Sequence, residues 1–400
     1  MRLWAVLPVA VALVVLLIVI MSLKEASTHS PPTSPTSAPA PLSPISLESG
    51  SYGDFAVSFY KRIALERLYE NLVLSPYSVY KAFAMAYAGA AGETREEIRR
   101  VFGFGDDACA LAQAGRGVEE AVAAWVQRGF PLREEYERGL SCLGAELRRA
   151  DFEDRSALVE INRWIEEKTR GYVKNLIPTD YPRSQDIRVV LTSALFFNGS
   201  WWPFQFARIG KREFQGVGPV EFMKLDLRSC ALPSLRGRVS ADLTVVELRF
   251  KNTDVAMYVI MPKSLEDYVK GLTYEKLKRD ITELSDEIVV VTMPLFTAEF
   301  KDSLKKVLID MGIRSAFDKT RANFTRMSPI RLYIDEVFHG TYIKADEKGV
   351  VATAATTVVF VPVCAKVGGM EVVIDKPFLF VLADRINGTI YFIGHVVKPN

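Results

Sequence analysis

Residues 347–367 read EKGVVATAATTVVFVPVCAKV, and this stretch decides how the chain is interpreted. Between Val350 and Val361 it contains no charge, no proline and no glycine, and its side chains are small, β-branched or aromatic. Every second residue from Val350 forms an uncharged face, and the opposite face is uncharged too, so the segment suits a strand with both faces buried. A permanently buried central strand is the simplest interpretation of this composition. The surrounding sequence has to show whether that interpretation holds.

The composition is that of a globular protein without a strong charge bias. Of 400 residues, 49% are hydrophobic, and 50 Lys and Arg against 48 Asp and Glu leave a net charge of +2. This balance does not give the broad positive field on which nucleic-acid binding depends, so no nucleic-acid partner is expected. Four cysteines without a CxxC pair exclude the common zinc-ribbon spacings, and we expect neither metal nor cofactor. Asn and Gln number only 13, and this shortage of heat-labile amides predicts a thermostable protein.

The amino-terminal segment predicts membrane anchoring or export. Residues 3–23 are almost wholly apolar and long enough to cross a bilayer, and Lys24 and Glu25 follow directly where a signal peptide would have a cleavage site. We therefore favour a retained anchor in residues 1–24 over a cleaved signal peptide. Residues 25–49 form a linker rich in Pro, Ser and Thr, a composition that predicts an extended stalk. The expected location is extracytoplasmic, either anchored at the cell surface or secreted.

Residues 50–400 contain no further linker or repeat, which predicts one folded domain. Helical periodicity dominates the first half, over residues 54–70, 75–90, 94–102, 134–149 and 157–173. β-Branched and aromatic runs dominate the second half, over residues 188–197, 243–250, 255–261, 288–293, 378–382 and 390–397. Ser75 has the side chain of a helix N-cap, and Asn387-Gly388 predicts a tight type I′ hairpin. Helices followed by strands predict an α+β fold.

No motif of an enzyme is present. The chain lacks a GxSxG elbow, an HExxH helix and a phosphate loop, and it has only three histidines. His339 follows a phenylalanine, and His395 lies within a predicted strand, so both are more typical of structural histidines. We expect no catalytic residues, and the chain is not expected to be an enzyme.

Several motifs of the folded body resemble the serpin family, in the order in which that family has them. They are NLVLSPYSV at 71–79, LTSALFFNGSW at 191–201, ANFTRMS at 322–328, VFH at 337–339, EKG at 347–349, DKPFLF at 375–380 and FIGHVVKP at 392–399. The resemblance covers most of residues 50–400. It implies a fold of three β-sheets and about nine helices, with an exposed reactive loop.

The resemblance also implies a mechanism and a set of site residues. Serpins of the inhibitory type are suicide substrates: a protease cleaves the loop, becomes acylated, and is trapped when the loop inserts into the central sheet. Family spacing places the scissile bond between Val363 and Cys364. The reactive-loop hinge would comprise Glu347, Lys348, Gly349, Val350, Val351, Ala352, Thr353, Ala354 and Ala355. The shutter and breach regions, where the sheet must part, would comprise Ser75, Ser78, Ser193, Trp201 and His339.

Small uncharged residues in the hinge favour an inhibitor, because a charge there would have to leave water on insertion. The alternative is a non-inhibitory serpin-like binding protein or chaperone, and a surface hydrolase with an unrecognised site is a third reading. One departure from the family is Leu295, which stands where many relatives have a base that pairs with the residue equivalent to Glu347.

The expected partner is a serine protease, and the chain is expected to be a monomer. Val363 favours elastase-like, chymotrypsin-like or subtilisin-like enzymes, whereas Lys366 leaves a trypsin-like enzyme open if the bond lies three residues further on. Cys109 and Cys142 are candidate disulfide partners, because both fall in the adjoining helical region, and an extracytoplasmic location would permit the bridge.

Overall fold

A computed structural model describes residues 52–105, 117–154, 156–178, 181, 187–228, 233–351 and 368–400. The predicted anchor and linker, Cys109, the hinge from Ala352 onward and the Val363–Cys364 bond lie outside these residues. Within them, no helix is both long and apolar enough to cross a membrane.

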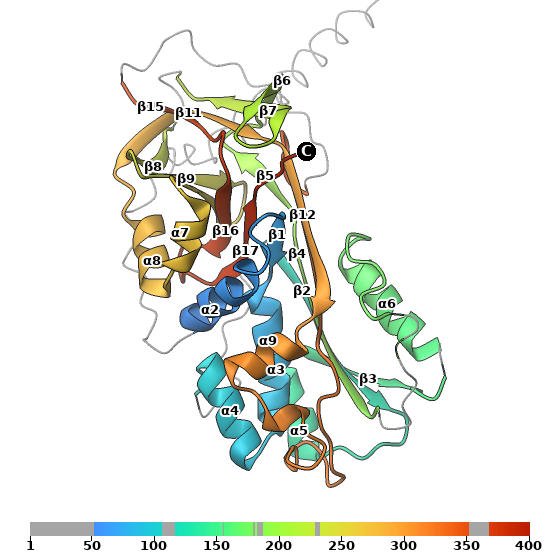
Figure 1. The fold of residues 1–400 in the computed structure, drawn as a ribbon. Coiled ribbons are helices and arrows are strands. Elements are labelled where there is room, and N and C mark those ends of the chain that lie inside the picture. The colour runs from blue at the N-terminus through green and yellow to red at the C-terminus, as the bar shows by residue number, and fades with distance from the viewer. Residues whose placement is uncertain are drawn as a thin grey trace, which may run out of the picture. The chain divides into compact units, whose positions relative to one another are not determined.

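The helices lie mainly in the first half of the chain, as the periodicity predicts (Figure 1). In the described residues they are α2 (Tyr52–Ala64), α3 (Pro76–Gly89), α4 (Gly92–Phe102), α5 (Glu134–Cys142), α6 (Ser156–Lys168), α7 (Leu265–Lys270), α8 (Tyr274–Thr282) and α9 (Lys305–Met311). Ser75 is the N-cap of α3, and its hydroxyl accepts a hydrogen bond from the Ser78 amide. The helix predicted over residues 134–149 is wrong in its second half. Gly144 has a φ of 68° after α5 ends, and residues 145–150 then pair as a strand.

The strands form three groups. The first is a three-stranded sheet in the order β3 (Ala145–Ala150), β2 (Val118–Gln127) and β4 (Val189–Phe197). The second is β12 (Phe296–Ser303), β13 (Phe338–Asp346) and the two-residue strand β14 (Gly349–Val350). β14 also pairs with β5 (Gly199–Trp202), which joins the second group to the third.

The third group contains the remaining strands. β1 (Leu72–Leu74), β17 (Ile390–Val396), β16 (Phe378–Asp384), β10 (Val255–Pro262), β9 (Leu243–Phe250) and β5 follow one another. β6 (Ala207–Phe214), β7 (Gly218–Asp226), β8 (Leu235–Val239), β11 (Asp286–Pro294) and β15 (Met370–Val373) attach beside them. The α+β prediction is confirmed. The β16–β17 hairpin is present, but Asn387 has no positive φ, so the predicted type I′ turn is wrong. The Asp384 carboxylate instead accepts the Ile386 and Asn387 amides and shapes a longer turn.

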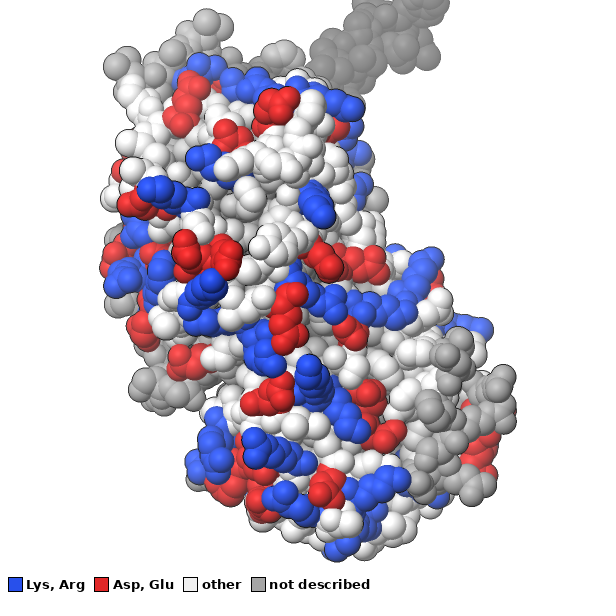
Figure 2. All heavy atoms as spheres, in the orientation of Figure 1, with Lys and Arg blue, Asp and Glu red and all other residues white. Residues whose placement is uncertain are grey.

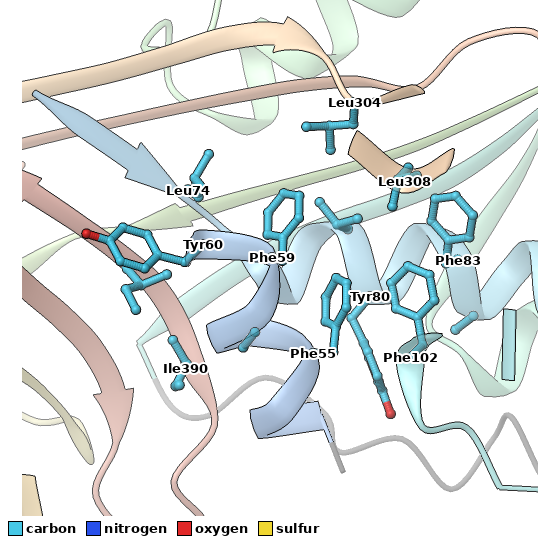
Figure 3. Packing of buried hydrophobic residues seen from close by; sticks show 14 of the residues in the cluster. Phe55, Phe59, Tyr60, Leu74, Tyr80, Phe83, Phe102, Leu304, Leu308 and Ile390 are labelled. Carbon is cyan, nitrogen blue, oxygen red and sulfur yellow. The ribbon is translucent and has the colours of Figure 1, made fainter. Parts of the chain in front are cut away.

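The strands β2 and β4 are covered on both faces. On one face, α2, α3 and α4 form an aromatic core in which Phe102 lies 4.3 Å from Phe55 and 4.7 Å from Phe83, ring centre to ring centre (Figure 3). On the other face, α6 packs its Trp164 edge-on against Trp125 of β2. Figure 1 shows α6 across these strands from α3. We call the α3 side the inner face and the α6 side the outer face.

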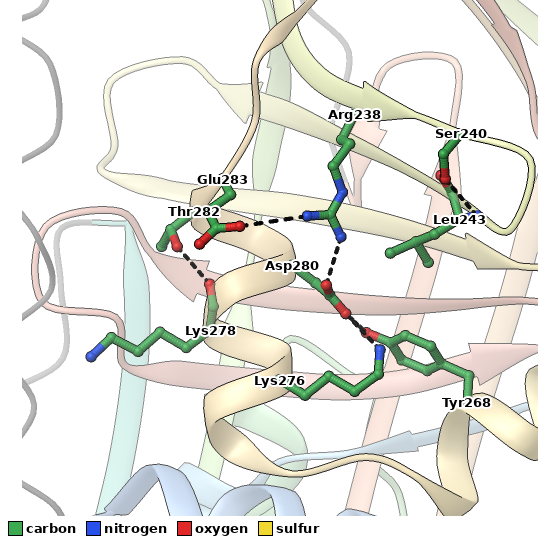
Figure 4. Close-up of polar contacts among 9 residues, drawn as sticks. All are labelled: Arg238, Ser240, Leu243, Tyr268, Lys276, Lys278, Asp280, Thr282 and Glu283. Carbon is green, nitrogen blue, oxygen red and sulfur yellow. Dashed lines mark hydrogen bonds and ion pairs between the residues drawn. The ribbon is translucent and has the colours of Figure 1, made fainter.

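Several charged groups join neighbouring elements. The buried Asp280 of α8 accepts from Arg238 of β8 at 2.6 Å, from Lys276 at 2.8 Å and from the Tyr268 hydroxyl at 2.9 Å (Figure 4). On the face drawn in Figure 2, Lys and Arg are interspersed with Asp and Glu.

Cys142 is disulfide-bonded, and its partner lies outside the described residues, so the pairing with Cys109 stays a prediction.

A second buried carboxylate ties α4 to the short 3-10 helix Ser315–Phe317. Glu97 Oε2 accepts the amides of Arg314 and Ser315 at 2.9 and 2.7 Å and the Ser315 hydroxyl at 2.7 Å. Burial acts to raise the pKa of Glu97, but these hydrogen bonds outweigh it and hold the pKa below its usual value. The carboxylate is therefore ionised in the folded state, and its Oε2 accepts three hydrogen bonds.

Replacing Glu97 by Ala should lower the free energy of unfolding by about 2–3 kcal/mol, because the amides of Arg314 and Ser315 and the Ser315 hydroxyl lose a charged acceptor. Denaturant titration of the folded body measures the change. The matched control is Glu96→Ala, which removes only an exposed ion pair with Arg99 and should have little effect. Equal losses in the two variants would contradict this account of Glu97.

Candidate functional site: the hinge and the slot beside it

The first hinge residues form a strand between two others. β14 runs antiparallel to the end of β13 on one side and to β5 on the other, with Val350 opposite both Ala345 and Gly199. The Val350 side chain is only 1% exposed and packs among the residues beneath these strands. Gly349 and Val350 thus already form a short strand between β5 and β13.

Only glycine fits at position 349. A Cβ on Gly349 would lie 2.0 Å from the carbonyl oxygen of Gly199, far inside van der Waals contact with backbone that cannot move aside. The residue also has a φ of 158°. The glycine therefore allows the hinge backbone to approach β5 closely enough to pair with it.

Three consecutive carbonyl groups before β14 are held by neighbouring donors. The Trp201 indole donates to Asp346 O at 2.7 Å, the Phe206 amide to Glu347 O at 2.8 Å, and the Trp201 amide to Lys348 O at 3.1 Å. Trp201 is itself fixed by stacking on Phe250, with ring centres 4.8 Å apart. The turn between β13 and β14 is thereby anchored at every residue.

Glu347 has a basic partner, although Leu295 stands where the family pattern would place one. The Arg208 guanidinium of β6 donates to the Glu347 carboxylate at 3.2 Å. Partial burial acts to raise the pKa of Glu347, but a backbone hydrogen bond and Arg208 together hold it below its usual value. The ion pair is partly exposed, so its contribution to stability is small, and its geometric role in orienting the turn matters more.

The backbone changes conformation at Val351. This residue has a φ of 51°, in the left-handed region that β-branched side chains rarely adopt, and its amide donates to Lys344 O at 2.9 Å. Such a conformation costs about 1–3 kcal/mol and would be relieved if the residue became extended. Within the described residues, the strand pairing of the hinge therefore covers two residues, and the residue that follows them has a strained backbone.

Below β14, the edges of β4 and β13 that face this position are without a strand partner in the described residues. β4 pairs with β2 along its whole length, and β13 pairs with β12 apart from its last two residues, which pair with β14. We call the space between β4 and β13 the slot. It continues the position that β14 already occupies, so the strand edges beside it are suited to accept more of the loop.

Comparisons with known proteins agree with this geometry. A family model described as serpin (serine protease inhibitor) matches residues 51–399. The chain belongs to the serpin family. An uncharacterised serpin-like protein of Pyrobaculum aerophilum is 62% identical over 359 residues, 89% of this chain and 96% of its own. Iripin-2 of Ixodes ricinus is 32% identical, with 82% of this chain and 88% of its own covered.

The solved structures agree in fold. Serpin48 of Tenebrio molitor superposes with a TM-score of 0.72 at 26% identity, covering 87% of this chain and 97% of its own. The resemblance stated from the sequence motifs is confirmed, and so is the serpin fold with its sheets and helices. Members of this family are generally protease inhibitors and not enzymes.

The residues predicted for the shutter of this serpin lie beneath the slot, on the inner face. The Ser75 amide donates to His339 Nε2 at 3.1 Å, and the Ser75 and Ser78 hydroxyls lie 3.0 Å apart. Burial lowers the pKa of His339 to about 3, so the imidazole is neutral and acts as an acceptor. Ser193 on β4 forms no hydrogen bond with His339 within the described part of the chain.

Two further residues at this serpin's sheet escaped the sequence analysis. Thr341 is buried, and its hydroxyl donates to Val73 O at 2.6 Å, which joins β13 to β1. Tyr172 lies over the slot on the outer face, between Phe196 of β4 and Tyr342 of β13. Neither residue belongs to a sequence motif that would predict its contacts, so these contacts can be found only from the way the strands pair.

Lowering the pH should destabilise this serpin through His339. The folded pKa of about 3 lies below the unfolded value of 6.5, so between these values the unfolded chain binds more protons. The free energy of unfolding should therefore fall as the pH drops through this window, by about 1.4 kcal/mol per pH unit from this residue. Denaturant titrations between pH 6 and 4 should show a smaller slope for His339→Gln, whose side chain keeps an acceptor but does not titrate. His395 remains in both proteins, and equal slopes would rule out the assignment.

Proposed function

We propose that this serpin inhibits serine proteases as a suicide substrate, trapping the acylated protease by inserting its cleaved loop into the slot. The observation that carries the proposal is the position of Val350. Its side chain is already buried between β5 and β13, and the edges of β4 and β13 that continue from it have no strand partner among the described residues. The residues that follow, through Ala355, are small and uncharged, so they can enter the sheet without burying an ionised group.

The proposed chemistry takes place at the Val363–Cys364 bond. The protease serine oxygen attacks the Val363 carbonyl carbon, an ester forms, the peptide bond breaks, and the leaving Cys364 nitrogen takes the proton. Water would normally hydrolyse this ester. Insertion of the freed loop competes with hydrolysis, and about ten new ladder hydrogen bonds at about 1 kcal/mol each would contribute on the order of 10 kcal/mol. This is comparable with the stability of a whole protease domain.

The target class and the location of the protein are part of the same proposal. Val363 favours elastase-like, chymotrypsin-like or subtilisin-like proteases, and Lys366 keeps a trypsin-like enzyme open. We propose an extracytoplasmic monomer, held at the cell surface through residues 3–23 or released after their cleavage. The shortage of Asn and Gln supports a heat-resistant protein.

A charge in the hinge should convert the inhibitor into a substrate. In Val350→Glu, the carboxylate would have to enter a site that is only 1% exposed, so insertion should become slower than ester hydrolysis. Incubation with a panel of serine proteases should give a denaturant-stable covalent complex with the parent protein and plain cleavage with the variant. Val350→Thr is the matched control of nearly the same shape, and it should still form the complex. Plain cleavage of the parent by every protease would favour the non-inhibitory alternative.

Cleavage of the loop should also make the protein harder to melt. The intact protein is proposed to lie above its lowest free energy, because insertion of the loop would add strand pairing that the facing edges of β4 and β13 lack among the described residues. Mass spectrometry should find a carboxyl-terminal fragment that begins at Cys364, and calorimetry should find a higher melting midpoint for the nicked protein. A fragment beginning at Val367 would move the scissile bond, and an unchanged midpoint would argue against insertion itself.

A further inference from the structure

The chain contains three sequences of the form Asn-x-Ser/Thr, which is the acceptor pattern for N-linked glycosylation. They begin at Asn198, Asn323 and Asn387. A pattern this short also arises by chance, so the surroundings of each side chain have to show whether it could carry a sugar. The sugar is bonded to the side-chain nitrogen, Nδ2, and that atom therefore has to be exposed with room in front of it.

Two of the three asparagines are poorly placed for a sugar. Asn198 is half-buried and directly precedes Gly199, which pairs with the hinge strand β14. A sugar there would stand beside the pairing on which the proposed function depends. Asn323 is also half-buried, and its Nδ2 faces the start of α4, 3.4 Å from the place where a Cβ on Gly92 would lie. This nitrogen has little room for a sugar.

Asn387 is the exposed member of the three, and it lies in the turn between β16 and β17. Its side-chain oxygen accepts a hydrogen bond from the Thr389 amide at 2.9 Å, and its Nδ2 forms no hydrogen bond within the described part of the chain. A sugar on Nδ2 leaves the side-chain carbonyl in place as an acceptor, so the bond from Thr389 would persist. The modification is therefore compatible with the folded hairpin.

The backbone of this turn is held by other groups as well. The Asp384 carboxylate accepts the Ile386 and Asn387 amides at 2.8 and 3.1 Å, and the Gly388 amide donates to Asp384 O at 2.9 Å. The neighbouring Ile386 is 67% exposed, which leaves most of an apolar side chain in water. A sugar on the next residue would shield this side chain.

The threonine of the same pattern is buried, and this restricts when the sugar can be added. Thr389 is 7% exposed, and its carbonyl oxygen accepts the Asp384 amide at 2.9 Å. A transferase has to contact the threonine hydroxyl as well as the asparagine, because both belong to the acceptor pattern. It has no access to Thr389 in the folded hairpin. The transfer must therefore precede the pairing of β16 with β17.

We propose that Asn387 is an N-glycosylation site that is modified during export, before the β16–β17 hairpin folds. The proposal rests on the extracytoplasmic location proposed above, because its donor is a lipid-phosphate-linked oligosaccharide of the membrane. The Asn387 Nδ2 forms a bond to the anomeric carbon of the first sugar and loses a proton to the transferase. The bond from that carbon to the lipid phosphate oxygen breaks, and the lipid phosphate leaves with the electron pair.

The test measures the masses of peptides from full-length protein produced in an archaeal host that glycosylates its own exported proteins. The peptide with Asn387 should carry a sugar, and the peptides with Asn198 and Asn323 should be unmodified. Asn387→Asp keeps the oxygen that accepts the Thr389 amide, and it should lose the whole mass increment. Thr389→Val removes the hydroxyl but nearly keeps the shape and should lose the increment too, whereas Thr389→Ser should keep it.

A matched control and a second experiment separate the site from the timing. Asn323→Asp makes the same change in another acceptor pattern, and it should leave the mass increment unchanged. Protein made in a bacterium that adds no sugars can be incubated with a purified transferase and the lipid-linked donor. It should accept the sugar after unfolding and not while folded, because only unfolding exposes Thr389.

An unmodified Asn387 would overturn the proposal, and the host's own surface glycoproteins, isolated from the same cells, show that the transferase is active. An increment that remains in Asn387→Asp, or equal transfer to folded and unfolded protein, would overturn it as well. The compartment from which the protein is recovered distinguishes two failures. Unmodified protein outside the membrane would refute the glycosylation alone, and unmodified protein in the cytosol would refute the proposed location too. Protease inhibition is measured separately and does not enter this test.

Discussion

Two strands, β5 and β13, hold Gly349 and Val350 between them, and the Gly199 carbonyl lies so close that no side chain fits on the first of these residues. The remaining features of the site depend on this close approach. It fixes the register of the loop against β4 and β13, and it determines which loop residue meets which strand residue if pairing continues. Anchoring by Trp201 and Phe206 keeps that register in place, since three successive carbonyls are already bound.

The two faces of the slot are built from different chemistry. On the inner face, neutral groups of Ser75, Ser78 and His339 satisfy one another, and burial keeps the imidazole uncharged. Among the described residues, parting the strands above them separates no buried ion pair, which would leave an uncompensated charge at a large cost. On the outer face, an ion pair and stacked rings hold the segment after α6 against both edges. The outer contacts are partly exposed, so breaking them costs less than opening the core would.

Much of the fold could be predicted from the sequence, because the strands with strong β-branched runs and the N-cap at Ser75 depend on local patterns. The strand at residues 145–150 was not predictable, since its Glu and Arg side chains suit an exposed helix equally well and only pairing with β2 makes it a strand. Arg208 was missed as the partner of Glu347 for a related reason: it lies 139 residues away and is brought there by the β6–β7 pairing. Tyr172 gives no periodic signal, and its place depends on a left-handed turn at an arginine. The loop residues were interpreted by composition, and their function stays a proposal.

The register also explains why Ser193 does not bond to His339. Extending the two pairings of β14 by six residues brings Thr356 opposite Ser193 on β4 and His339 on β13 at the same level. The two residues lie across the slot from each other, one strand position apart, so a direct hydrogen bond between them would require the slot to close. In such an extended pairing Thr356 would share the inner face with Val350, and its hydroxyl would suit a place between a serine and a neutral imidazole.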